Sequence, residues 1–367
     1  MRFARQYLRA YVPARTARWP EASRLFVVGD DIGWSIDDDT ARLSRTARRL
    51  GYDAFPGSWA RFAKRQAVFH VEHFGALRPR WLDSSHRLGL SYFHGRPGTP
   101  GYPEFDQVYA ALRSHAARVD RVQVTHGEME ELVLEAGVDR SKVFRIPIGV
   151  DIEHFPFVDA QARADSRREL ALPESAFVVG SFQKDGVGWG EGLEPKQIKG
   201  PDMLVATLEV LRARIPDLAV LLTGPARGYV RRQLERVGIP YRYANLNPRG
   251  RLASAYHALD VYLVTSRQEG GPKSVLESMA AGAPLVTTRV GQAPELVSDG
   301  ENGLLADVDD VEALAACVQR VRDDAELASR LRTAGRPTAE AHADERLDPL
   351  WAGLLAGFVE KDGRHAH

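Results

Sequence analysis

The sequence is poor in features that mark several classes of protein. It has one cysteine, Cys317, in 367 residues, which excludes an internal disulfide and a cysteine-based zinc site and is typical of a reducing compartment. Basic and acidic residues number 49 each, so no net charge attracts nucleic acid. The sequence has no apolar run of about 18 residues and no apolar signal-peptide core. We therefore expect a cytoplasmic protein that binds no nucleic acid and does not span a membrane.

The first twenty residues differ from the rest of the chain in charge, because they are strongly basic. The segment MRFARQYLRAYVPARTARWP carries five arginines, no acidic residue and interleaved apolar side chains. Such a composition can rest on an anionic membrane surface. It is also compatible with a basic lead-in that packs on the protein, so peripheral contact at the inner face of the membrane is one of two interpretations.

Short apolar runs alternate with helical patterns along the chain. The runs are RLFVV, AVFHV, LGLSYF, RVQVT and KVFRIPIG in the first half, and SAFVVGSF, LAVLLTG, DVYLVTS and APLVTT in the second. This alternation predicts parallel sheets covered by helices, and the length predicts two domains. We predict an α/β protein with an N-terminal domain over residues 1–165 and a C-terminal domain over 166–345. A last helix, within 346–367, is expected to cross back to the N-terminal domain, and the cleft between the domains is the expected binding site.

The segment TSRQEGGPKSVLESMAAG, residues 265–282, predicts an anion site. Its pattern favours a helix from about 272 to 281, with Pro272 at the first helical position and Gly282 at the C-terminal stop. Three amide groups of the first turn are expected to be unpaired, those of Lys273, Ser274 and Val275. The helix dipole adds positive potential there, and Gly270 and Gly271 allow a phosphate to approach closely.

Two glutamates accompany this anion site. Glu277 lies one turn inside the predicted helix, and its side chain leans back toward the helix start. A carboxylate repels phosphate but accepts hydrogen bonds from vicinal hydroxyls, so a ligand with both phosphate and sugar explains the pairing. The alternative is an exposed ion pair between Lys273 and Glu277, with Glu269 as an ordinary loop acid.

The pattern of Glu269, seven residues and Glu277 resembles the signature of glycosyltransferase family 4, the retaining nucleotide-sugar transferases of the GT-B fold. The resemblance extends over residues 120–325, through VDRSKVFRIPIGVDIEHF, QIKGPDMLVATLEVL and VGQAPELVSDGENGLLADVDDVEAL. It implies two Rossmann-like domains that face each other across a cleft. It also implies metal-independent transfer of a hexose-type sugar, with retention, from a nucleotide-diphosphate donor to an acceptor hydroxyl, without a cofactor.

The resemblance also assigns roles in the C-terminal domain. Glu269 would contact the transferred sugar, and Glu277 the ribose hydroxyls. The donor phosphates would lie against a turn composed of Gly270, Gly271, Pro272, Lys273 and Ser274. Lys199 would neutralise the leaving diphosphate. The family's partner arginine is missing, because Ser181 stands at its expected place; Lys184 is the candidate substitute, and the glycine-rich segment after it is expected to form a mobile loop.

In the N-terminal domain the resemblance points to a glycine and to histidines. Gly33 falls where the family's glycine loop approaches the donor. His70 and His73 follow an apolar strand where the family carries a histidine near the reacting carbon, and their spacing leaves both as candidates. His94 is expected on the acceptor side. No acidic or cysteine spacing completes a metal-ligand set around these histidines.

Two alternatives to a transferase remain open. One is a nucleotide-sugar epimerase on the GT-B architecture, with an acid/base set in the acceptor pocket. The other is a non-catalytic nucleotide-sugar-binding subunit, suggested by the missing arginine. For a transferase, the acceptor is expected to be a carbohydrate, a lipid-linked group or a small molecule.

Overall fold

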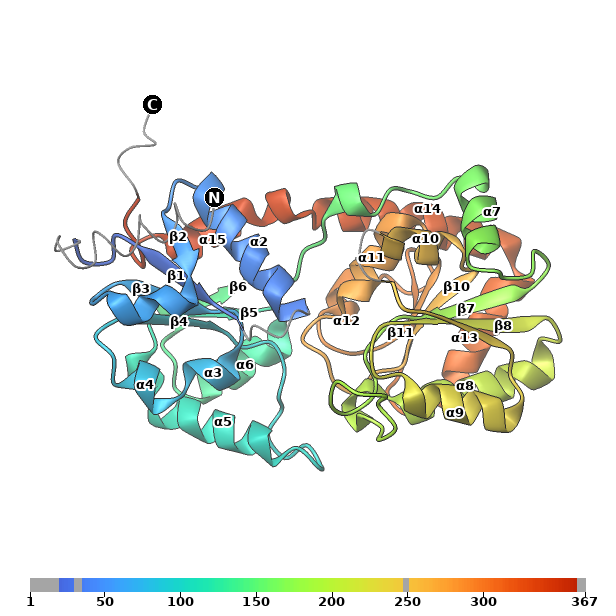
Figure 1. Ribbon diagram of the computed structural model, residues 1–367, viewed down its shortest axis with the longest axis horizontal. Coiled ribbons are helices and arrows are strands. Elements are labelled where there is room, and N and C mark those ends of the chain that lie inside the picture. Colours follow the sequence, from blue (N-terminus) through green and yellow to red (C-terminus); the bar gives the residue numbers. More distant parts are fainter. Residues whose placement is uncertain (1–19, 30–34, 247–250, 362–367) are drawn as a thin grey trace. The chain divides into compact units, whose positions relative to one another are not determined.

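The computed structural model describes residues 20–29, 35–246 and 251–361 (Figure 1). The chain forms two compact units, the first made of Met1–Pro147 and Glu345–His367 and the second of Ile148–Asp344. The boundary therefore precedes the position expected from the sequence. Residues 148–165 belong to the second unit because Phe155 lies in its apolar core and the Val158 amide donates to the Ala281 carbonyl at 3.1 Å.

The first unit is built on a parallel sheet of six strands in the described part of the chain, in the order β2-β1-β3-β4-β5-β6. Its strands are β1 (Leu25–Val28), β2 (Ala54–Pro56), β3 (Ala67–His70), β4 (Arg87–Ser91), β5 (Arg121–Val124) and β6 (Val143–Arg145). Its α-helices are α2 (Ser35–Arg49), α3 (His73–Ala76), α4 (Pro79–Leu82), α5 (Pro103–Ser114), α6 (Gly127–Glu135) and α15 (Asp348–Leu355).

Helices cover both faces of this sheet. One apolar cluster joins Leu43 of α2 and Leu354 of α15 to Phe69 of β3, and another joins α5 and α6 to β4 and β5. Strands buried on both faces read as continuous apolar runs, which is why the sequence pattern revealed them. The C-terminal segment belongs to this unit, and Phe358 packs its ring edge-on against Phe69 at 6.4 Å between centroids. Leu350 of α15 is 43% exposed, whereas Leu354 and Leu355 of the same helix are fully buried.

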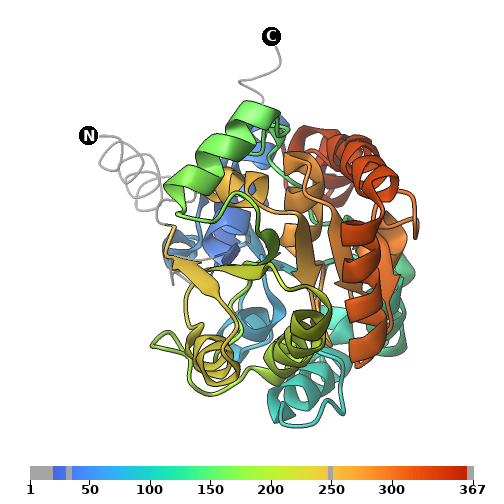
Figure 2. The same ribbon diagram turned by 90° about the vertical axis from the view of Figure 1, so that its right-hand side faces the viewer.

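The second unit repeats the design with strands in the order β12-β11-β10-β7-β8-β9, all parallel. Its strands are β7 (Phe177–Ser181), β8 (Leu218–Thr223), β9 (Tyr241–Ala244), β10 (Val261–Val264), β11 (Leu285–Thr288) and β12 (Leu304–Ala306). Its α-helices are α7 (Ala160–Glu169), α8 (Pro201–Arg214), α9 (Gly228–Val237), α10 (Leu252–His257), α11 (Lys273–Ala281), α12 (Ala293–Leu296), α13 (Val311–Asp323) and α14 (Ala325–Ala341). Helices α8, α9 and α13 cover one face, and α10 and α11 the other, as Figure 2 shows from the side of this unit.

The predicted α/β class with parallel sheets is confirmed, and each apolar run named from the sequence contains a strand. Three strands were not predicted, β2, β9 and β12, and each lies at the edge of its sheet. Edge strands are short and pair on one side only, so their sequences need no long apolar run. Cys317 is a free, buried residue of α13, as its apolar surroundings in the sequence predicted.

Candidate active site

The second sheet has a point where its strand order reverses. The chain enters at β7, moves outward through β8 and β9, and returns to β10 on the other side of β7. In doubly wound sheets, ligands bind beyond the carboxyl ends of the two strands at such a point. The segment that leaves β7 there carries Lys184 and Lys199 and leads into α8, and the segment that leaves β10 carries Glu269 and leads into α11.

Lys199 lies in a tight turn in which the next position has no room for a side chain. It ends a short 3-10 helix (Gln197–Lys199), and Gly200 follows with a φ of +60°. A Cβ atom on Gly200 would lie 1.9 Å from the Thr265 carbonyl oxygen, so only glycine fits. The Thr265 hydroxyl donates to the Gly200 carbonyl at 2.9 Å, and the Arg267 amide to the Ile198 carbonyl at 2.9 Å. The turn is thereby fixed to the segment that carries Glu269.

The structure brings Lys199 and Glu269 into direct contact. Lys199 Nζ lies 2.5 Å from Glu269 Oε2, and the side chains are 23% and 9% exposed. The Ser266 hydroxyl lies 2.8 Å from Glu269 Oε1, and Gln183 Nε2 donates to the Lys199 carbonyl at 2.8 Å. Glu269 is therefore a largely buried, doubly held carboxylate, unlike a solvated loop acid. Ser266 and Gln183 were missed because isolated hydroxyl and amide residues carry no recognisable spacing.

Helix α11 begins one residue later than predicted. It starts at Lys273, with Pro272 at the N-cap, and stops at Gly282, whose φ is +80°. The expectation that the Val275 amide is unpaired is wrong, because this amide donates to the Pro272 carbonyl at 3.0 Å. Ser274 stays in the first turn, and its hydroxyl hydrogen-bonds to Tyr262.

The turn before α11 is packed tightly against the following strand–helix connection. A Cβ atom on Gly271 would lie 2.7 Å from Gln292 Cδ, and one on Gly291 would lie 2.7 Å from the Glu269 carbonyl oxygen. Gln292 is buried, and its Oε1 accepts a hydrogen bond from the Ile148 amide at 2.9 Å. The glycine at 271 thus has a packing role that the sequence interpretation did not include.

Glu277 accepts a hydrogen bond from a buried tyrosine. The Tyr256 hydroxyl donates to Glu277 Oε2 at 2.9 Å. Burial, and then the charge of Glu277, raise the pKa of Tyr256 well above its ordinary value, so this hydroxyl remains a donor. Burial also raises the pKa of Tyr262 to about 12. Two neutral tyrosines therefore support the first turns of α11, Tyr256 through Glu277 and Tyr262 through Ser274.

Lys184 lies within the electrostatic reach of Lys199. Burial, and then the neighbouring Lys199 charge, lower the pKa of Lys184. Its Nζ donates to the Gly186 carbonyl at 3.0 Å and lies 4.8 Å from the centroid of the Trp189 ring. The segment after Lys184 forms a hairpin, with an antiparallel bridge between Gly186 and Pro195 at its base. The mobility expected from its glycines stays a prediction.

The predicted histidines of the first unit are buried. His70 ends β3, next to β1 where this sheet also reverses its order, and contacts Trp81 edge-on at 4.9 Å between centroids. His73 stacks on Tyr92 at 4.2 Å and lies 5.4 Å from the His94 ring. Burial lowers the pKa of His70 and of His73 to about 3, so both are neutral at physiological pH. Gly33 lies outside the described residues, as does the basic N-terminal segment.

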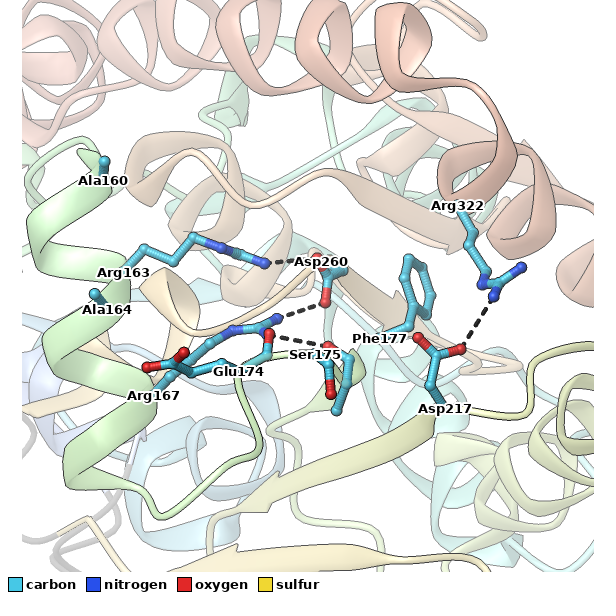
Figure 3. A pocket seen from close by; sticks show the side chains of 11 residues that line it. Ala160, Arg163, Ala164, Arg167, Glu174, Ser175, Phe177, Asp217, Asp260 and Arg322 are labelled. Carbon is cyan, nitrogen blue, oxygen red and sulfur yellow. Dashed lines mark hydrogen bonds and ion pairs between the residues drawn. The ribbon is translucent and has the colours of Figure 1, made fainter.

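A cavity of about 630 Å³ lies at the amino ends of the strands of the second sheet, opposite to the candidate site (Figure 3). Its wall is formed by residues at the amino ends of β7, β8 and β10. Arg163 and Arg167 extend from α7 and both bind the Asp260 carboxylate at 2.6 Å, while Arg322 binds Asp217 at 3.0 Å. These arginines already have carboxylate partners, and the cavity lies far from the carboxyl ends of the strands. We therefore interpret the charged residues of this cavity as a structural ion-pair network and not as a ligand site.

Two further properties concern the described residues only. No three histidine, cysteine, aspartate or glutamate side chains among them gather closely enough to hold a metal ion. In the same ranges, no helix combines the length and the apolar character that a membrane-spanning segment needs.

Comparisons with known proteins agree on one family. Residues 187–324 match the family described as "Glycosyl transferases group 1". The chain is 30% identical over 217 residues to D-inositol 3-phosphate glycosyltransferase of Corynebacterium glutamicum (strain R), covering 56% of this chain and 50% of the relative. It is 32% identical over 202 residues to the GDP-mannose-dependent alpha-(1-6)-phosphatidylinositol monomannoside mannosyltransferase of Mycolicibacterium smegmatis, covering 52% and 50%. The chain thus spans about half the length of these relatives.

The fold has close neighbours among solved structures. Anabaena Alr3699/HepE in complex with UDP-glucose aligns with a TM-score of 0.69 at 17% identity, covering 91% of this chain and 99% of that protein. Sucrose-phosphate synthase from Thermosynechococcus elongatus aligns with a TM-score of 0.70 at 18% identity, covering 91% and 98%. At such identities the likeness establishes the fold, which is GT-B.

Proposed function

We propose that the chain is a member of glycosyltransferase family 4, as its similarity to these relatives supports, and that it transfers a hexose-type sugar from a nucleotide-diphosphate donor to an acceptor hydroxyl, with retention of anomeric configuration. The observation that carries the proposal is the arrangement at one sheet edge. Lys199 is paired with Glu269, and Tyr256 holds Glu277 on α11. This arrangement joins a cation for phosphate to two carboxylates for sugar hydroxyls.

The donor's diphosphate would rest on the turn at residues 270–274 and on the start of α11. The helix dipole and the Lys199 ammonium both favour negative charge there. As the glycosidic bond breaks, charge grows on the departing phosphate, and groups already in place stabilise it most. Lys184 adds a second cation whose amine is already close enough to Lys199 to have its pKa lowered. In this proposal the departing phosphate would itself accept the proton of the attacking hydroxyl.

The two glutamates would hold the sugar and the ribose. Glu277, oriented by Tyr256, would accept hydrogen bonds from the ribose hydroxyls, and Glu269 would contact the transferred hexose. His70 and His73, neutral and buried at the end of β3, are the candidates for a group near the reacting carbon, and His94 is the candidate for the acceptor side. A neutral imidazole can donate or accept a hydrogen bond without competing for the phosphate.

The acceptor and the location form a further part of the proposal. One relative is named for a phosphatidylinositol monomannoside acceptor and others for D-inositol 3-phosphate, so we include lipid-linked and small polyol acceptors with carbohydrates. A cytoplasmic protein with peripheral membrane contact would meet both the donor and a lipid-linked acceptor. The single free cysteine is consistent with a reducing compartment.

The proposal is tested by donor binding and by turnover. We would screen UDP- and GDP-sugars for thermal stabilisation and repeat the best donor with Glu277→Ala and Lys199→Ala. Both variants should lose the stabilisation, whereas Glu301→Ala, at an exposed acid of the same unit, should keep it. An undiminished shift in either site variant removes that residue from the site.

Turnover separates the alternatives. Transfer requires an acceptor, so incubation with donor alone should leave the donor sugar unchanged. An altered sugar in that incubation would favour the epimerase. Donor binding that survives Glu269→Ala, with no product on any acceptor, would favour a non-catalytic binding subunit.

A further inference from the structure

The glycine-rich segment after β7 forms a hairpin with an ordered base. The Val187 amide donates to the Glu194 carbonyl at 2.9 Å, and the Lys196 amide donates to the Asp185 carbonyl at 2.8 Å. These bonds lie on either side of the antiparallel bridge between Gly186 and Pro195. Lys184 immediately precedes this base, so the base determines where its side chain starts.

The hairpin is seated on the start of α9, and two of its glycines make this possible. A Cβ atom on Gly186 would lie 2.3 Å from the Ala226 carbonyl oxygen, and one on Gly192 would lie 2.2 Å from it. The Gly228 amide donates to the Glu191 carbonyl at 2.7 Å, which adds a direct backbone bond between the hairpin and α9. Two backbones packed this closely move as one body.

A fully buried ion pair lies at the contact between the hairpin and the start of α9. Arg227 Nη2 is 3.0 Å from Asp185 Oδ2, and both side chains are completely buried. Arg227 Nη1 also donates to the Ser181 carbonyl at 2.6 Å and to the Thr223 carbonyl at 2.9 Å. Its Nη2 lies 3.2 Å from the Ser181 hydroxyl. One guanidinium therefore connects the ends of β7 and β8 to the base of the hairpin.

Position 181 is where the family resemblance places an arginine. Here Ser181 occupies that position, and the guanidinium that contacts it comes from Arg227, which follows the carboxyl end of the neighbouring strand β8. A buried ion pair is a poor source of stability, because desolvation offsets the attraction. Arg227 contacts both Ser181 and Asp185. Lys184 lies between these two residues in the chain.

We propose that Arg227, through its ion pair with Asp185, is a positioning residue that holds the Lys184 ammonium beside Lys199, so that two cations face the leaving diphosphate. The inference rests on the proposed function for the meaning of that placement. In this arrangement the chain has not lost the family's second positive group. It has divided the task between a half-buried lysine that would meet the donor and a buried arginine that positions this lysine.

A double-mutant cycle tests whether Arg227 acts through Lys184. Arg227→Lys keeps the charge but loses the branched contacts to Ser181 and Thr223, and we expect kcat to fall about tenfold with little change in donor KM. In a Lys184→Met background the same substitution should lower kcat no further. Equal falls in both backgrounds would show that Arg227 acts independently of Lys184 and would overturn the inference.

A second readout follows the lysine directly and needs no turnover. Competitive amine labelling against pH should give Lys184 a pKa below the ordinary value of a lysine side chain. Arg227→Lys should shift the Lys184 titration toward its ordinary value. Asp185→Asn leaves the backbone contacts of Arg227 in place and replaces Arg227→Lys in the kinetic cycle if that variant does not fold, but it does not serve the titration, because it also removes a carboxylate that raises the Lys184 pKa. An unchanged Lys184 titration in folded Arg227→Lys contradicts the inference.

Arg167→Lys is the matched control. Arg167 is also a buried arginine paired with an aspartate of the second unit, Asp260, but at the amino ends of the strands (Figure 3). It should lower stability without moving the Lys184 titration or kcat. If no donor binds or turns over, the proposed function fails while the labelling result still decides the role of Arg227.

Discussion

Acid should destabilise the first unit through His70 and His73, the two histidines with no solvent exposure among its described residues. Burial lowers the pKa of His70 and of His73 to about 3, whereas an unfolded histidine has a pKa of about 6.5. Between these values the unfolded chain binds more protons than the folded one, so stability falls as the pH drops below about 6.5. From pH 7 to pH 5 each histidine should remove about 2 kcal/mol, or about 4 kcal/mol together.

The assay is urea unfolding at pH 7, 6 and 5, monitored by tryptophan fluorescence. Trp189 is the only tryptophan of the sequence within residues 148–344, so a Trp189→Phe background makes the signal report the first unit alone. His70→Phe and His73→Phe keep the ring contacts with Trp81 and Tyr92 but cannot be protonated. Each should remove about half of the pH dependence.

A control and a refuting result complete this test. His115→Gln, at an exposed histidine of the same unit, should leave the loss between pH 7 and pH 5 as it is in the parent protein. The reasoning is refuted if His70→Phe and His73→Phe lose as much stability as the parent over this range. The two imidazoles would then be charged in the folded state, and their proposed role as neutral groups would fail with them.

Three other predictions concern the second unit. Gly200→Ala should lower the free energy of unfolding by several kcal/mol in urea, because its Cβ meets a carbonyl oxygen at 1.9 Å, whereas Gly190→Ala, with no atom within 4 Å, should be tolerated; equal effects would refute the packing argument. Tyr256→Phe should weaken donor binding about five- to tenfold by calorimetry, since it removes the hydrogen bond that orients Glu277; unchanged affinity would contradict that role. Lys199→Met should lower kcat by about 10² with a smaller effect on donor affinity, and retained kcat would exclude it from leaving-group stabilisation.

The sequence predicted the fold well because buried parallel strands leave a strong pattern. Apolar runs such as LAVLLTG and DVYLVTS are required by burial on both faces, and they became β8 and β10. Three of the edge strands, β2, β9 and β12, lacked this requirement and were missed, whereas the edge strand β6 was predicted. The unit boundary was placed too late because residues 148–165 are polar and irregular, although a few side chains such as Phe155 fix them to the second core.

The candidate site was predictable where its residues lie in one local segment. Glu269, Glu277 and the start of α11 share one turn and helix, so their spacing alone indicated a site. The partners that come from elsewhere in the chain could not be found this way. Tyr256 supports Glu277 from α10, and Arg227 reaches Ser181 from the start of α9. Such contacts depend on which strands become neighbours, and that is a property of the sheet order rather than of local sequence.

The glycines show the same limit. Sequence reasoning interpreted Gly271 and the alternate glycines after Lys184 as room for a ligand or as flexibility. The structure shows instead that Gly186 and Gly271 are places where two parts of the protein pack together without a side chain between them. A glycine that permits close packing and a glycine that permits motion look identical in a sequence.

The central claim is that the donor diphosphate lies on the turn before α11 with Glu277 at the ribose. The most direct measurement is a crystal structure of the protein with a nucleoside diphosphate bound. We predict phosphate oxygens within hydrogen-bond distance of the main chain at residues 270–274 and of Lys199, and ribose hydroxyls on Glu277. A diphosphate bound instead among Arg163 and Arg167 at the opposite edge of the sheet, with Glu277 contacting no part of it, would contradict the account.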